Sequence, residues 1–286
     1  MADSVVKKEQ QQVATLDFSM VEADSGLGNK EVDQETLSIP FLKTNLSPAI
    51  LDANRGALKG DMYNTVTGEI YNRDKGVLVL PCVFQRRFIH WSPLGDEQSA
   101  PIAIYSTKEE CPATERLKKD QGDNKDYLTD GSGHYIEDTH QHYCLIIKTD
   151  DNGKPTGATD AVMIAMKSTS LKASRKWNSI ISTRRKQKAD GSMFIPPRFL
   201  YTYSLGTYME SGRKGDYFVW DMKLKEELTD INLYNEAKAF ALSVEQNNVD
   251  VKYEQDESQA EAPKPTTPPK AEVKAKAEVL KDELPF

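Results

Sequence analysis

A run of basic residues between Ala161 and Ala189 is the part of this chain best suited to chemistry, because it contains no Asp or Glu. Ordinary solvent-facing segments mix charges of both signs, whereas cations alone neutralise phosphates and release their counterions. The 29-residue run therefore predicts a surface that binds the phosphate backbone of a nucleic acid. We expect six of its eight cations to bind phosphate: Lys172, Arg175, Lys176, Arg184, Arg185 and Lys186.

The segment Leu171-Lys-Ala-Ser-Arg-Lys-Trp177 lies inside this run and predicts a helix near residues 170–187. At helical spacing, Lys172, Arg175 and Lys176 fall on one side, three and four residues apart. The opposite side carries a more apolar set: Leu171, Ser174, Trp177 and Ile181. A Trp ring can stack on an unpaired base, but this spacing favours a place for Trp177 in the core.

Two other segments combine basic and aromatic residues. Gln85-Arg-Arg-Phe-Ile-His-Trp91 continues an apolar strand, and alternation places Arg87 and Trp91 on one face. Glu210-Ser-Gly-Arg-Lys-Gly215 is a Gly-rich connection that offers Lys214 between two aromatic strands. We expect Arg87 and Lys214 to help bind phosphates, and bases to stack on some of Trp91, Tyr201, Tyr203 and Tyr217. For Tyr201 and Tyr203, a place in the core is the equal alternative.

Enzymatic sites find little support in the sequence. It contains no GxxxxGK[ST] phosphate loop, no GxSxG and no HExxH, so we expect neither catalysis nor a cofactor. One group has metal-ligand character: His134, His140, His142 and Cys144, with Cys111 upstream. Structural zinc sites usually take closely paired ligands from turns, whereas these residues alternate into a strand. Ordinary strand and loop residues are therefore the favoured interpretation, and a zinc site is the alternative.

The last five residues, Asp282-Glu-Leu-Pro-Phe286, form an acidic and aromatic tip. The preceding proline-rich residues 262–270 and the low-complexity run 271–278 offer too little apolar surface to offset the entropy of ordering. A solvated tether would thus present the tip to an apolar pocket of a partner protein, rimmed by Arg or Lys. The alternative is a tail that only increases solubility. The tip resembles the C-terminal end of single-stranded DNA-binding proteins of bacteria and of tailed phages, and its partner-binding residues would be Asp282, Glu283, Leu284, Pro285 and Phe286.

The formal net charge of −7 is spread unevenly along the chain. Residues 1–38 have a balance of −5 and residues 254–286 one of −3, which leaves +1 for the body. Such asymmetry is typical of acidic tails around a neutral-to-basic domain. We therefore expect a disordered acidic N-terminal tail (1–36), one folded domain (37–250) with an insertion at about 92–140, and a flexible linker with its tip (251–286).

Strand patterns dominate the body. Residues 76–84, 142–148, 161–167, 199–205 and 216–224 predict strands, and a second helix is expected near 233–246. This pattern predicts a mainly β, α+β fold: an OB-like barrel enlarged by insertions, with a sandwich as the alternative. The three cysteines include no CxxC pair, and the N-terminus has no apolar signal core, so we expect a protein of the reducing cytoplasm.

Four segments extend the resemblance to tailed-phage proteins across residues 37–245: Leu37–Leu42, Gly60–Gly68, Pro81–Phe88 and Leu171–Trp177. They look like replication-region proteins of the short-tailed-phage type, a family of single-stranded DNA-binding proteins. The resemblance implies an OB-fold core, sequence-tolerant binding of single strands and a tail that recruits phage or host replication or recombination proteins. The body is larger than a minimal OB domain. The alternatives are a recombination mediator or scaffold that binds DNA weakly, and a DNA-processing nuclease with an unrecognised site.

Overall fold

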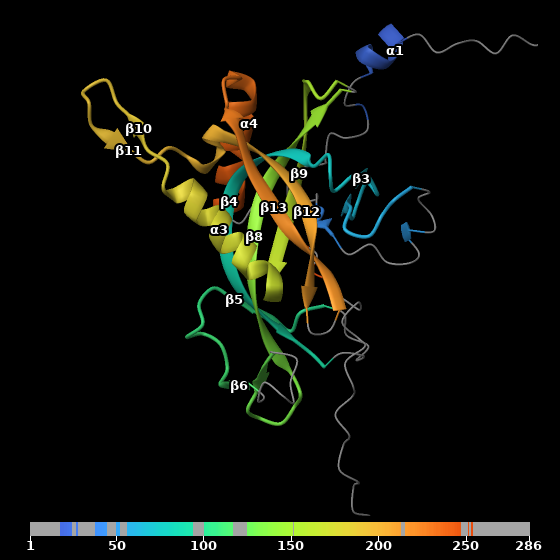
Figure 1. Ribbon diagram of the computed structural model, residues 1–286, viewed down its shortest axis with the longest axis vertical. Coiled ribbons are helices and arrows are strands. Elements are labelled where there is room, and N and C mark those ends of the chain that lie inside the picture. The colour runs from blue at the N-terminus through green and yellow to red at the C-terminus, as the bar shows by residue number, and fades with distance from the viewer. Residues whose placement is uncertain are drawn as a thin grey trace, which may run out of the picture.

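The computed structural model describes residues 18–24, 27, 38–44, 50–51, 56–93, 100–116, 125–150, 152–212, 215–246, 251 and 253 (Figure 1). These residues are mainly β with a few helices, which confirms the predicted fold class. The helical elements are α1 (Phe18–Ala23), η1 (Ser168–Ser170), α3 (Leu171–Ser182), η2 (Arg198–Leu200) and α4 (Ile231–Glu245). Helix α1 lies within the N-terminal stretch for which no folded element was expected. None of the described helices is long and apolar enough to cross a bilayer.

The strands form one large antiparallel sheet and two small ones. The large sheet has the order β13-β12-β4-β8-β7-β6, with β5 paired to β4 and β9 paired to β8. Its strands are β4 (Val77–Trp91), β5 (Ala103–Tyr105), β6 (Thr114–Arg116), β7 (Asp126–Leu128), β8 (Tyr135–Thr149), β9 (Pro155–Lys167), β12 (Tyr201–Gly212) and β13 (Gly215–Glu227). The small sheets contain β1 (Leu42–Lys43), β2 (Met62–Asn64) and β3 (Ile70–Tyr71), and β10 (Lys186–Gln187) and β11 (Met193–Phe194).

Strands β4 and β8 are the spine of the large sheet. Each has 15 residues, and they pair along almost their whole length, from Val79↔Ile146 to Trp91↔Tyr135. The register shifts between Pro81 and Val83, where proline removes a backbone donor from the ladder. Strand β9 flanks β8 from Thr139 to Thr149, and β12 pairs with the start of β4. The opposite end of the spine is flanked by β5 and β7, which belong to residues 92–140.

The two longer helices cover opposite faces of this sheet (Figure 1). Successive residues of the spine alternate between them, so that Val79 and Cys144 face α3 while Leu80 and Leu145 face α4. Both faces are therefore buried, which explains why these strands are continuous apolar runs. The Asp230 carboxylate caps α4 by accepting hydrogen bonds from the amides of residues 232 and 233 at 2.8 and 3.3 Å.

The large sheet is open, and this corrects the OB-like barrel part of the predicted fold. Among the described strands, β13 and β6 stand at its two ends and do not pair with each other. A barrel needs one enclosed core, whereas this sheet has a separate core against a helix on each side. The small β1–β2–β3 sheet lies beside its edge strand β9 through a bridge between Phe41 and Met163.

Candidate nucleic-acid interface

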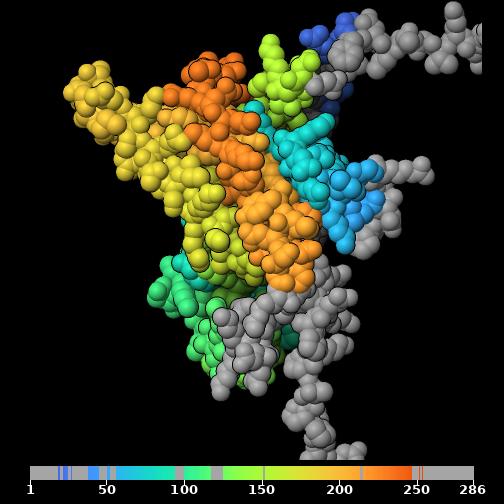
Figure 2. All heavy atoms as spheres, viewed as in Figure 1, coloured from blue at the N-terminus to red at the C-terminus, as the bar shows by residue number. Residues whose placement is uncertain are grey.

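Helix α3 presents the predicted basic face to solvent. Lys172, Arg175 and Lys176 are all exposed, while Ala173, Ser174, Trp177 and Ile181 are buried beneath them. None of the three cations forms an ion pair with a described residue. Figure 2 shows α3 and the segment after it, in yellow, on the front surface beside the orange β12–β13 hairpin. The helix therefore presents three cations that have no ion-pair partner in the part of the chain that the structure describes.

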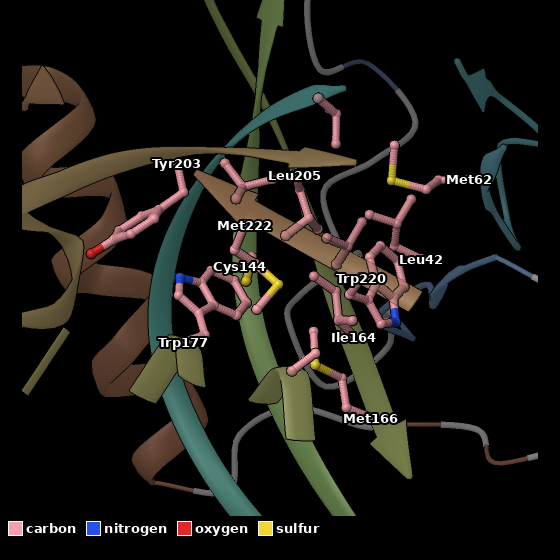
Figure 3. Close-up of a cluster of buried hydrophobic side chains, with 14 of the residues drawn as sticks. Leu42, Met62, Cys144, Ile164, Met166, Trp177, Tyr203, Leu205, Trp220 and Met222 are labelled. Atoms are coloured by element: carbon pink, nitrogen blue, oxygen red, sulfur yellow. The ribbon is translucent and has the colours of Figure 1, made fainter. Parts of the chain in front are cut away.

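The inner face of α3 is fixed to the sheet by aromatic and polar contacts. Trp177 is fully buried, which confirms its expected place in the core, and its ring meets that of Tyr203 edge-on at 5.7 Å (Figure 3). The Ser174 Oγ lies 2.7 Å from His140 Nδ1 and 2.7 Å from His142 Nε2. A hydroxyl has one proton, so it donates to one imidazole and accepts from the other. Burial lowers the pKa of His142 well below its usual value, which keeps that ring neutral.

Three consecutive basic residues, Arg184-Arg185-Lys186, follow α3 and form a segment called the basic root. The Arg184 guanidinium lies over the ring of half-buried Tyr201, 5.2 Å from its centroid. The exposed Arg185 donates to the carbonyl of Ser182 at 2.7 Å, at the C-terminal end of the helix. Lys186 donates to both carboxylate oxygens of Glu227 at 2.8 Å, so its charge is already matched. Two of the three cations of this root, Arg184 and Arg185, thus remain without a carboxylate partner among the described residues.

One acid that senses the charge of Lys172 is held by tyrosines. Glu210, on β12, accepts hydrogen bonds at 2.9 Å from the hydroxyls of Tyr208 and Tyr217. These bonds lower the pKa of Glu210, and the charge of Lys172 lowers it further. Tyr217 is half-buried and packs against the core below α3, while its hydroxyl is engaged by Glu210.

Comparison with known protein families identifies the family to which this chain belongs. The family model described as Pam3 phage gp34-like protein matches residues 7–250. The chain belongs to this family. It is accordingly a phage protein. Searches of curated proteins and of solved structures find no match.

Three of the expected DNA-contacting residues are not on the surface that α3 presents, and for Tyr203 this agrees with the core alternative. Trp91 and Tyr203 are 2% and 1% exposed, so neither ring is open to a base. The Trp91 indole donates to Glu137 at 3.2 Å and packs near Tyr253. Arg87 is on the face of the sheet opposite α3, because alternation places it with Ile89 and Trp91. Both faces of the spine are covered by other elements, so an aromatic side chain on either face is buried in a core.

Other expected site residues fall outside the described part of the chain. Lys214, which follows β12 and precedes β13 in the sequence, is one of them. The tip residues Asp282, Glu283, Leu284, Pro285 and Phe286 also lie beyond the residues that the structure describes.

The histidines and cysteines of the zinc alternative are not brought together. His140 and His142 share Ser174, whereas His134 Nδ1 lies 3.1 Å from His90 Nε2 near the other end of the spine. Cys111 donates to the carbonyl of Thr107. Within the described ranges, no group of three or more His, Cys, Asp or Glu side chains is placed to hold a metal ion.

Sequence reasoning missed two features of this surface. Arg198 lies beside α3: it donates to the side-chain oxygen of Asn178 at 2.9 Å, and its guanidinium is 5.7 Å from the Phe84 ring centroid. No described carboxylate pairs with it, and burial lowers its pKa. The second feature is the trio of exposed apolar residues that follows the basic root, Met193, Phe194 and Ile195. A short apolar run after the turn residues Gly191-Ser192 was the only signal for it.

Proposed function

We propose that the protein binds single-stranded DNA without catalysing a reaction, and that its C-terminal tip recruits replication or recombination proteins of the phage or its host. The observation that carries this proposal is the exposed basic face of α3, in which Lys172, Arg175 and Lys176 have no ion-pair partner among the described residues. A surface of unpaired cations on a rigid helix favours an anionic polymer, because phosphates gain charge-assisted contacts and release counterions.

The resemblance of the tip and of the body segments to phage single-stranded DNA-binding proteins supports the same function, and membership of a phage protein family is compatible with it. The basic surface continues from α3 to Arg184 and Arg185, with Tyr201 beside them. The arrangement contacts phosphates and offers few polar groups for reading bases, so binding should tolerate many sequences.

The test is the salt dependence of binding. A fluorescently labelled oligo-dT and a matched duplex are titrated with the full chain in buffer containing a chelator, and the anisotropy is followed over about 50–300 mM salt. With about six phosphate contacts, the logarithm of the association constant should fall with the logarithm of salt concentration at a slope of about −4. A slope near zero, or equal affinity for duplex and single strand, would overturn the proposal. Shortening of the oligonucleotide after magnesium is added would point to a nuclease instead.

A further inference from the structure

The segment after α3 forms an arm that projects from the body. Strands β10 and β11 pair antiparallel, with Lys186 opposite Phe194 and Gln187 opposite Met193. A turn closes the arm through hydrogen bonds between Lys188 and residues 191 and 192, with Gly191 at a φ of +81°. Figures 1 and 2 show this arm standing away from the sheet beyond the C-terminal end of α3.

The arm exposes apolar side chains that a monomer would usually bury. Met193 is 57% exposed, Phe194 37% and Ile195 62%, in three consecutive positions. None belongs to the two main cores, which lie against α3 and α4. An exposed apolar cluster of this kind, rimmed by polar residues, usually marks a surface that binds a ligand or another macromolecule.

The charges around this cluster identify what it contacts. Arg185 and Lys188 are exposed on the same arm. The one acid between them and the cluster, Asp190, accepts hydrogen bonds from the backbone and hydroxyl of Ser192 at 2.8 and 2.6 Å and so serves the turn. Apolar and aromatic side chains, among cations that have no carboxylate partner in the described ranges, match a strand that has both phosphates and open base faces.

We propose that the β10–β11 arm is the base-contacting element of the DNA surface. Phe194 stacks on an unpaired base, Met193 and Ile195 provide apolar contacts beside it, and Arg185 and Lys188 bind the flanking phosphates. This inference rests on the proposed function. It assigns base contact to residues outside the expected set, in which Trp91 and Tyr203 are buried. In a duplex the base faces are stacked inside the helix, so the arm favours single strands and adds little to duplex binding.

The experiment compares Phe194→Ala with the full-length wild type on three labelled ligands: oligo-dT, an abasic oligonucleotide of the same length, and a duplex. Loss of one stacked base corresponds to about tenfold weaker binding. Phe194→Ala should therefore weaken binding to oligo-dT about tenfold while it leaves the abasic strand, the duplex and the salt slope nearly unchanged. Phe194→Trp should restore binding to oligo-dT. Ile231→Ala is the matched control, because Ile231 is 65% exposed but lies on α4, on the other side of the sheet.

Four results would overturn the inference. If the wild type binds oligo-dT and Phe194→Ala binds it equally well, the proposed function stands, but the arm does not contact bases. An equal loss on the abasic strand would show that Phe194 acts on the shape of the surface and not on a base. A wild-type dimer that Phe194→Ala converts to a monomer, measured by sedimentation, would assign the arm to contact with a second copy of the chain. If the wild type itself fails to bind oligo-dT, the proposed function fails and the inference falls with it.

Discussion

The indole of Trp177 stacks on the imidazole of His142, with ring centroids 4.7 Å apart and ring planes 23° from parallel. The first ring belongs to α3 and the second to β8, so this pair joins the helix to the centre of the sheet. Both side chains are fully buried. The contact orients α3 so that its three cations point outward, and links the stability of the core to the geometry of the basic surface.

The neutrality of His142 predicts a loss of stability in mild acid. Burial lowers its pKa well below 6.5 in the folded protein, whereas the unfolded chain takes up its proton near pH 6.5. The stability that the folded protein gains from keeping His142 neutral is complete above pH 6.5 and is lost as the pH falls below that value. The free energy of unfolding should therefore decrease by up to about 1.4 kcal/mol per pH unit from His142 alone. Burial lowers the pKa of His140 and His90 in the same direction.

Urea unfolding between about pH 8 and pH 5 measures this effect. The His142→Asn variant keeps a neutral hydrogen-bonding side chain at this position, and its free energy of unfolding should depend less on pH over this window. A wild-type free energy that stays constant from about pH 7.5 to 5 would contradict the assigned protonation state.

Removal of the outer charges of α3 should weaken DNA binding without unfolding the protein. The variant Lys172→Ala/Arg175→Ala/Lys176→Ala loses three phosphate contacts, so the salt slope should become flatter by about 2. Binding to all sequences should weaken alike, because phosphate contacts carry no base information. A control variant, Lys59→Ala/Lys75→Ala/Lys108→Ala, removes the same charge from exposed positions elsewhere. Equal losses in both variants would show that net charge, and not this surface, governs binding.

The three tryptophans should be poor reporters of DNA. Trp91, Trp177 and Trp220 are 2%, 0% and 5% exposed. Their emission should be blue-shifted and resistant to acrylamide, and saturating poly-dT should change its intensity only slightly, because no indole is available for stacking. Thermal stability in the same buffer confirms that the protein is folded. Strong quenching by poly-dT would mean that a tryptophan contacts bases, and that the surface lies elsewhere.

Deletion of residues 282–286 should separate partner recruitment from DNA binding. We expect the preceding Pro-containing segment to act as a flexible tether that gives the acidic tip a high effective concentration near the basic surface, so that the tip competes weakly with DNA. The truncated chain should bind single strands equally well or more tightly, most clearly at low salt, and lose a polymerase, nuclease or recombinase partner in pull-down experiments. Phe286→Ala retains every acidic side chain and should lose only the partner. Loss of DNA binding on truncation would place the tip within the DNA-binding surface.

The sequence alone determined the elements whose pattern is local. Residues 77–84 and 142–148 are apolar on both faces, and they lie in the central strands β4 and β8. The spacing of Trp177 and Ile181 against Lys172, Arg175 and Lys176 gave the two sides of α3 directly, because a helix of 3.6 residues per turn separates them by position.

Tertiary structure alone decided which rings are open to solvent. Alternation assigns Trp91 and Tyr203 to a face of a strand, but it does not say whether that face is covered, and here α3, α4 and neighbouring segments cover both faces. Sheet closure was undetermined for the same reason, since strands buried on both sides suit either a barrel or a sheet between helices. The exposure of Phe194 was equally hidden in the sequence. A short apolar run in a strand usually packs in a core, and only the direction of the β10–β11 arm, away from both cores, leaves these side chains in solvent.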